Sequence, residues 1–425
     1  MKTQTHTIKF ISRASIAAFG AYFCMYAFRK PFAVATFENL TAFGIDYKIL
    51  LIIAQVLGYM LSKFIGIKII SELKPKQRVL YLLALIGISE IALILFGWIP
   101  QPYNIICMFL NGLPLGMIWG IVFSYLEGRK YTEILGVILC TSFIVSSGVV
   151  KSVGLWVMSA WGVSQFWMPA ITGALFIIPL IFFAWLLETI PPPTEEDKEL
   201  RVERVPMHRK ERLHVIRQFA LPLFILIIFY TILTAFRDLR DNYARELWDS
   251  LGYAGDISVY STSEIAVALL VLVILASVYA IKDNFKALLT YHGILLIGTF
   301  SVGIATVLLQ SGYLDPFYWM VISGFGLYIC YVPFNALFFD RFIAAFRISG
   351  NAGFLIYLAD AFGYMGSMAV LLYKNFGMNK ISWLQFFVNG AYLLSILGTL
   401  SVIISFFQLR KKHLKSNFKV VTHES

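Results

Sequence analysis

Long apolar runs recur along the whole chain, each about as long as a helix that crosses a membrane. A hydrocarbon core of about 30 Å takes about 20 residues of helix. The pattern therefore predicts an all-α membrane protein with twelve transmembrane helices. The predicted spans are residues 12–37, 49–70, 79–98, 104–126, 134–158, 166–187, 219–241, 258–281, 287–309, 316–338, 351–373 and 383–408.

The longest connection between spans begins with a run of prolines and is highly charged, and it separates the first six spans from the last six. We therefore expect an N-terminal bundle of residues 1–187, a cytoplasmic linker of 188–218, and a C-terminal bundle of 219–425 with a basic tail. Ala-Phe-Arg occurs in the first and seventh spans, ending at Arg29 and Arg237, with a tyrosine seven residues before each arginine. This recurrence favours two halves related by an axis along the membrane normal.

Composition supports a membrane protein. Hydrophobic residues make up 59% of the 425 residues and charged residues only 14%, whereas soluble domains have about 45–50% and about 25%. The net charge of +11 comes from Lys and Arg in short loops, which argues against nucleic-acid binding. Basic residues bias orientation, and they predict that both termini are cytoplasmic. The expected location is a bacterial inner membrane. The four cysteines lie inside apolar runs without metal or redox spacing.

Two cations interrupt the first apolar run. The stretch Ala14–Phe28 would rise only about 22 Å as a helix, so Phe32–Phe37 would have to complete the span, with Arg29 and Lys30 inside it. Charges at that depth are costly and mark functional sites. Arg29 and Arg237 facing each other across a cavity would suit a phosphate or carboxylate. The alternative is that both extend to the lipid headgroups.

Further polar side chains within the spans extend this candidate substrate site. Lys63 is a candidate third cation, with cytoplasmic snorkelling as the alternative. Hydroxyl groups facing the cavity are expected from three tyrosines: Tyr22, Tyr26 and Tyr59. Lys30 is expected to pair with an acid of the seventh span, Asp238 or Asp241.

Two more ion pairs are hypotheses that depend on a two-bundle architecture. Lys151 in the fifth span and Glu264 in the eighth would face each other as a gate or along the substrate path. Asp360 in the eleventh span would face Lys63. Together with Lys30 and Asp241 these residues are the candidates for gating or coupling. The alternative is that each pair only fixes helix packing.

These residues resemble a known family. "Y-x3-Y-x2-RKPF" (Tyr22 to Phe32) and "GYMLSKFIG" (Gly58 to Gly66) are similar to motifs of the organophosphate:phosphate antiporters of the major facilitator superfamily. The resemblance implies two pseudo-symmetric six-helix bundles and substrate arginines at Arg29 and Arg237, and Glu264 matches the glutamate of the family's eighth helix. The chain departs from that pattern at Phe143, where the family has histidine.

The favoured function is a secondary transporter that moves a small organic anion by alternating access. The leading candidate for the substrate is a phosphate ester, which would be exchanged for phosphate. A membrane receptor of a phosphorylated ligand on the same fold is the alternative. No motif of a catalytic or metal site occurs, so we expect no enzyme activity and no cofactor. The expected partners are a small anionic substrate and the lipid bilayer, and the expected functional unit is a monomer.

Overall fold

Helices make up nearly all of the regular structure in the computed structural model, which describes residues 2–127, 129, 131–195, 197, 209–348, 352–378 and 380–421. The helices of the first part are α1 (Lys2–Tyr26), α2 (Tyr47–Glu72), α3 (Arg78–Trp98), α4 (Ile105–Leu115), α5 (Ile118–Phe123), α6 (Thr132–Trp161), α7 (Met168–Leu175) and α8 (Ile177–Glu188). Those that follow are α10 (Arg209–Gln218), α11 (Ala220–Asn242), α12 (Ala244–Ser250), α13 (Ser258–Val278), α14 (Asn284–Gln310), α15 (Pro316–Ala336), α16 (Phe338–Ala345), α17 (Ala352–Phe376) and α18 (Trp383–Val421).

The short elements connect the ends of these helices. They are the 3-10 turns η1 (Pro31–Val34) and η2 (Pro75–Gln77), and a hairpin of β1 (Thr41–Ala42) and β2 (Ile45–Asp46). The two strands pair antiparallel, with Thr41 opposite Asp46. The hairpin turn contains Gly44 at φ 73°, a backbone conformation that glycine adopts without steric cost.

The predicted all-α fold with twelve membrane-spanning segments is confirmed, although the bounds of the first span differ. Among the described residues, eleven helices are long and apolar enough to cross a membrane, and α7 with α8 forms a twelfth span bent by 44°. Pro179 accounts for the bend, because it lacks the N–H that would bond to Leu175 and its ring clashes there. In the fourth span Pro114 lies in α4, one residue before that helix ends at Leu115.

The prediction of one continuous first span over 12–37 is wrong. The helix ends at Tyr26, and the chain continues through a turn and η1. Pro31 explains this ending, because it disfavours helical geometry in the preceding residue and removes a backbone donor. Since α1 begins at Lys2, its 25 residues rise about 38 Å without help from Phe32–Phe37. Arg29 and Lys30 therefore lie in the turn after the helix.

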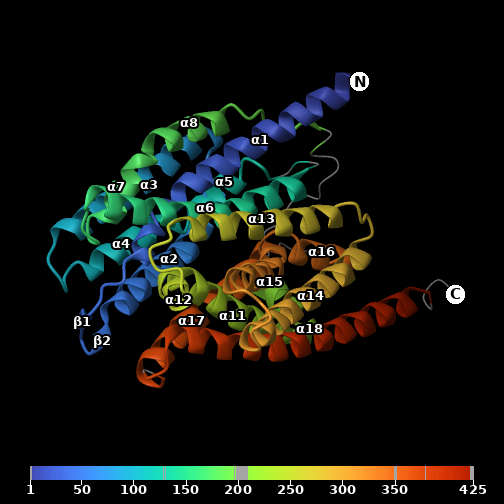
Figure 1. The fold of residues 1–425 in the computed structure, drawn as a ribbon. Helices are drawn as coiled ribbons and strands as arrows, with labels where there is room; N and C mark the ends of the chain where they lie inside the picture. Colours follow the sequence, from blue (N-terminus) through green and yellow to red (C-terminus); the bar gives the residue numbers. More distant parts are fainter. Residues whose placement is uncertain are drawn as a thin grey trace. The chain divides into compact units, whose positions relative to one another are not determined.

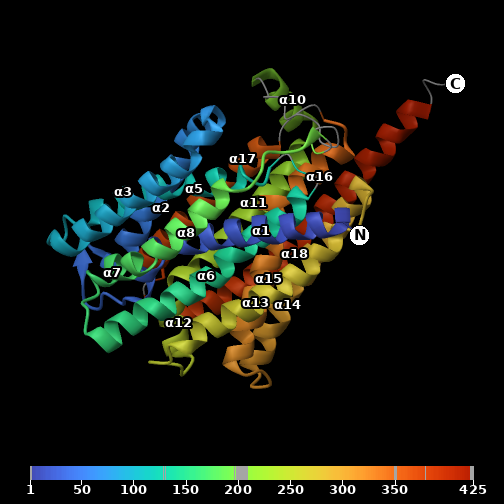
Figure 2. The same cartoon turned by 90° about the horizontal axis from the view of Figure 1, so that it is seen from above.

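The described chain forms two compact units. The first comprises Met1–Val202, Leu239–Leu272 and Met368–Leu384, and the second Glu203–Asp238, Val273–Ser367 and Gln385–Ser425. In the first unit α1 lies between α6 and α8, while α4 packs against both α2 and α3 (Figure 1). In the second unit α14 packs side by side with α15 and against α16 (Figure 2).

The segment predicted as a solvated linker contains a helix in its last part. Helix α10, labelled in Figure 2, covers Arg209–Gln218. Residues 196 and 198–208 of the predicted linker lie outside the described residues. The basic tail continues α18 as helix to Val421. The predicted division into two bundles at 188–218 stays a prediction.

Glycines allow α2 and α4 to cross closely, as small residues do where membrane helices pack. A Cβ added at Gly112 would lie 2.1 Å from the carbonyl oxygen of Gln55, and one added at Gly58 would lie 2.2 Å from that of Phe109. Both obstacles are backbone atoms, so they move only if the helices separate.

Replacing Gly112 with alanine is therefore expected to destabilise the protein by about 1–3 kcal/mol, the usual cost of overpacking. Gly87→Ala is the matched control, because nothing lies within 4 Å of a Cβ at Gly87. That change should be neutral or stabilise by up to about 1 kcal/mol through helix propensity. Thermal unfolding of the detergent-solubilised protein measures both, and equal melting temperatures for the two variants would contradict the close crossing.

Candidate functional site

The break after α1 leaves backbone carbonyls without helical partners, and side chains of α2 and α4 bind them. Gln55 Nε2 donates to the carbonyl oxygen of Arg29 at 3.0 Å, and Asn111 Nδ2 donates to that of Phe28 at 2.9 Å. A helix end that is buried requires such partners. These two amides therefore hold the backbone from which the Arg29 side chain projects.

Asn111 is the centre of this polar network. Its Oδ1 accepts a hydrogen bond from Gln55 at 2.8 Å, and its Nδ2 also donates to Ser89 Oγ at 2.6 Å. All three side chains are buried, and Asn111 is 0% exposed. A buried network whose members are satisfied fixes one arrangement of the helices that contribute to it.

Aromatic rings surround the Arg29 guanidinium. Its central carbon lies 3.9 Å from the ring centroid of Tyr59 and 5.9 Å from that of Tyr26. Tyr22 packs edge-on against Tyr26, with ring centroids 5.6 Å apart. Lys63 Nζ lies 5.5 Å from the Tyr59 ring. The structure thus brings these five predicted residues together, and ring faces stabilise cations held in this way.

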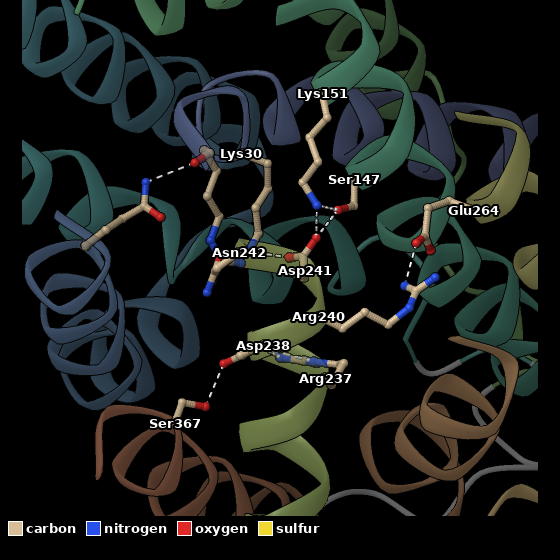
Figure 3. Close-up of polar contacts among 12 residues, drawn as sticks. Lys30, Ser147, Lys151, Arg237, Asp238, Arg240, Asp241, Asn242, Glu264 and Ser367 are labelled. Carbon is tan, nitrogen blue, oxygen red and sulfur yellow. Dashed lines mark hydrogen bonds and ion pairs between the residues drawn. The ribbon is translucent and has the colours of Figure 1, made fainter. Parts of the chain in front are cut away.

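Lys30 and Lys151 meet at one carboxylate, that of Asp241 on the last turn of α11. Both ammonium groups form ion pairs with it (Figure 3). Ser147, one turn before Lys151 on α6, donates its hydroxyl to the same carboxylate. Lys30 also donates to Asn242 Oδ1 at 3.0 Å. Of the two acids expected for Lys30, Asp241 is therefore the partner.

The predicted pairing of Lys151 with Glu264 is wrong, because each takes another partner. Lys151 binds Asp241, and Glu264 Oε1 lies 2.5 Å from Arg240 Nη1. The two helices are nevertheless close: a Cβ added at Gly148 of α6 would lie 2.1 Å from the carbonyl oxygen of Tyr260 in α13. Glu264 therefore lies beside α6 but is turned towards α11.

A further buried ion pair joins α2 to α12. Lys48 Nζ lies 2.5 Å from Glu246 Oε1 and donates to the carbonyl oxygen of Ala33 at 2.8 Å. Lys48 is 1% exposed. Burial raises the pKa of the Glu246 carboxyl, and the positive charge of Lys48 opposes that rise. Burial likewise raises the pKa of Tyr243, next to this pair.

In the second unit, Arg237 binds the acid that follows it in sequence. Its Nη2 lies 2.5 Å from Asp238 Oδ1, and its central carbon lies 3.7 Å from the ring centroid of Tyr331. Ser367 of α17 donates to the other oxygen of Asp238 at 2.8 Å. Arg237 therefore contacts both the face of an aromatic ring and a carboxylate. The rings beside Arg29 are those of Tyr26 on α1 and Tyr59 on α2.

Asp360 accepts a hydrogen bond of 2.6 Å from the hydroxyl of Tyr230. The oxygen of this hydroxyl in turn accepts a hydrogen bond of 3.2 Å from Asn335 Nδ2. Tyr230 is the tyrosine seven residues before Arg237. Asp360 and Lys63 belong to different units, as do Arg29 and Arg237. The pairing of the first two and the facing of the two arginines stay predictions.

Sequence reasoning missed the neutral and paired residues that orient these charges: Gln55, Ser89, Asn111, Ser147, Arg240 and Glu246. The available signal was an isolated amide within an apolar run, as in "AQVLGY" and "LNGLPL", because a lone amide in a membrane span needs a partner. Among the described residues no group of three or more His, Cys, Asp or Glu has the geometry of a metal site.

Solved structures with the same fold are transporters. They include a D-xylose-proton symporter, 16% identical with a TM-score of 0.61, which covers 93% of this chain and 96% of its own. A bacterial homologue of the human drug peptide transporters PepT1 and PepT2 is 14% identical with a TM-score of 0.61, and the match covers 96% of this chain and 99% of that one. The nucleoside transporter NupG is 14% identical with a TM-score of 0.57, and the match covers 94% of this chain and 99% of that one. This likeness shows the twelve-helix fold of the major facilitator superfamily.

Sequence comparisons place the chain in a family. No curated protein matches it significantly. A family model described as "Family of unknown function (DUF5690)" matches residues 31–412, which include all the predicted site residues except those of α1 and Arg29 and Lys30. Because this match spans most of the sequence, the chain belongs to the DUF5690 family.

Proposed function

We propose that the protein is a secondary transporter of a small organic anion that works by alternating access. The observation that carries this proposal is the buried Arg29, whose backbone is held by Gln55 and whose guanidinium lies over Tyr59. A guanidinium binds carboxylates and phosphates through two parallel hydrogen bonds. Tyr59 lies within the candidate membrane span Tyr47–Gly66, so the Arg29 guanidinium lies at that depth, where a positioned cation indicates a ligand pathway.

The fold supports transport, because its solved representatives named above are transporters of a sugar, peptides and a nucleoside. In the proposal, residues 1–187 and 219–425 form two halves that rock about the bound anion, with both termini in the cytoplasm of a bacterial cell. The finer form is exchange of a phosphate ester for phosphate, supported by the resemblance of residues 22–32 to organophosphate antiporters.

The test is anion flux in proteoliposomes loaded with phosphate, with labelled phosphate, a sugar phosphate or a carboxylate outside. Arg29→Lys keeps the charge but loses the two-bond geometry, so uptake should fall by about tenfold to a hundredfold. The matched control is Arg245→Lys, because Arg245 pairs with Asp249 outside the spans. Wild-type flux in Arg29→Lys would refute the anion site. Ligand binding without flux would instead indicate a receptor.

A further inference from the structure

Glu90 on α3 is a buried carboxylic acid within a membrane span. It lies in the candidate span Pro75–Trp98 and is 8% exposed. Its Oε2 is buried, and no group in the described part of the chain donates a hydrogen bond to it. The other buried acids of the described residues have partners, which are Arg237 for Asp238, Lys151 for Asp241, Arg240 for Glu264 and Tyr230 for Asp360. Among these acids, Glu90 is the one whose charge no described residue balances.

Apolar groups of two other segments lie against the Glu90 carboxyl. A Cβ added at Gly173 of α7 would lie 2.4 Å from Glu90 Oε2 and 3.0 Å from Cδ1 of the Phe28 ring. The carboxyl group therefore occupies the space next to the glycine backbone, with the ring of Phe28 beside it, and Phe28 is 1% exposed. An ionised carboxylate without a partner is far more costly in such surroundings than a neutral acid, so the group binds a proton instead.

The titratable groups on neighbouring elements do not neutralise Glu90. Helices α4, α5, α7 and α8 and the turn η2 pack against α3, and α5 and α7 contain no titratable residue. The titratable residues of the others, and of the turn that follows Phe28, are Cys107, Glu188, Lys76, Arg29 and Lys30. Within the described part of the chain none of them forms a hydrogen bond or an ion pair with Glu90. Lys30 binds Asp241 instead, and the Arg29 guanidinium lies over Tyr59.

Glu90 also lies beside the segment that positions Arg29. Phe28, whose ring is next to the carboxyl, precedes Arg29, and its carbonyl oxygen accepts a hydrogen bond of 2.9 Å from Asn111. Asn111 in turn donates to the hydroxyl of Ser89, the neighbour of Glu90 in sequence, at 2.6 Å. Loss of the proton would create a charge that requires water, and water reaches it only if α3 separates from α7 and from Phe28. Protonation of Glu90 and the placement of Arg29 therefore depend on each other.

We infer that Glu90 is a proton-binding site and that the protein moves one proton together with each anion. The inference rests on the proposed transport function and names the ion that couples it. The Glu90 carboxylate accepts the proton from water on one side of the membrane, forming an O–H bond, and returns it to water on the other side, so no further reactant is needed. Acids within membrane spans serve as proton sites in this way. When one anion is exchanged for another, the proton stays bound, so exchange requires only the neutral acid.

Carbodiimide labelling of the detergent-solubilised protein tests proton binding without any flux. A membrane-soluble carbodiimide reacts with protonated carboxyl groups, so it should modify Glu90 at neutral pH, and the modification should decrease as the pH is raised. Mass spectrometry of the peptides measures it. Glu38, which is exposed in the loop before β1, is the comparison and should be labelled at least about tenfold less, because exposed glutamates are ionised at neutral pH. Equal labelling of the two residues, or no labelling of Glu90 at neutral pH, would overturn the inference.

Glu90→Gln tests the coupling in proteoliposomes, because the amide keeps the volume of the acid but cannot release a proton. The probes are labelled phosphate, a sugar phosphate and a carboxylate, with the membrane potential clamped at zero. Accumulation by the wild type should exceed that by Glu90→Gln about tenfold for each pH unit by which the outside is more acidic. Both proteins meet the same titration of the anion in solution, so the difference belongs to Glu90. Glu90→Gln should keep exchange of labelled for unlabelled anion at equal pH, and Glu38→Gln, the matched control, should behave as the wild type.

The outcomes separate this inference from the proposed function. Equal accumulation by the wild type and Glu90→Gln under a pH gradient would overturn the coupling and leave transport standing. Loss of exchange at equal pH in a folded Glu90→Gln would assign the acid a structural role and would overturn it too. If Glu90→Gln does not fold, Glu90→Met is used, with Glu38→Met as its control and the same expectation. Labelling of Glu90 in a protein that shows no flux of the three anions would refute transport and leave the proton site standing.

Discussion

Replacing Glu246 with glutamine is expected to destabilise the protein by about 3–5 kcal/mol, because it leaves the Lys48 ammonium buried without its counter-ion. Lys48 is 1% exposed as a side chain, and Glu246 is 19% exposed. The amide keeps the volume of the carboxylate, so the loss would reflect charge. Chemical or thermal unfolding in detergent measures it.

The neighbouring pair of Arg245 with Asp249 is the control for Glu246→Gln. These side chains are 24% and 30% exposed and one helical turn apart on α12, and exposed pairs contribute about 1 kcal/mol or less. Asp249→Asn should therefore cost less than about 1 kcal/mol. Similar losses for the two amide variants would show that burial of Lys48 has no special consequence.

Asn111→Leu is expected to destabilise by about 2–4 kcal/mol. The apolar side chain would leave the carbonyl of Phe28 and one amide contact of Gln55 without partners, and each unsatisfied buried group costs about 1–3 kcal/mol. Because Gln55 holds the Arg29 carbonyl, the same change should also weaken anion binding. Unfolding and ligand-dependent melting temperatures measure these two effects.

Asn389→Leu provides the comparison for Asn111→Leu. Asn389 is exposed on α18 and accepts a hydrogen bond from Gln385 on the same helix, so leucine there leaves no buried group unpaired. Its unfolding free energy should stay within about 0.5 kcal/mol of the wild type, as for most surface changes. If Asn111→Leu is equally mild, the amide network does not hold the break after α1.

The spans could be predicted from sequence because membrane thickness sets their length and an apolar run reports it directly. The end of α1 could have been predicted from Pro31 as well, but the length argument assumed that the helix begins at Ala14 and so extended it to Phe37. In the structure α1 begins at Lys2. The error therefore came from the start of the helix, because a search for apolar runs does not detect helical residues that are polar.

The partners of the buried charges were harder to predict. Sequence places Lys151, Arg240 and Glu264 on known helices, but the choice of partner depends on how each helix is rotated about its axis. For Lys30 the prediction named two acids of the seventh span, Asp238 and Asp241, and only the structure distinguishes them. Glu264 was assigned to Lys151 without considering Arg240, three residues after Arg237. The amides of Gln55 and Asn111 acquire their role only when tertiary structure brings a broken helix end to them.

Helix α11 carries Asp238 and Asp241 three residues apart, and these carboxylates serve different compact units. Asp238 binds Arg237 and Ser367 in the second unit, while Asp241 binds Lys30 and Lys151 in the first. Residues three apart lie on the same side of a helix. A turn of α11 about its own long axis would therefore disturb both sets of contacts at once.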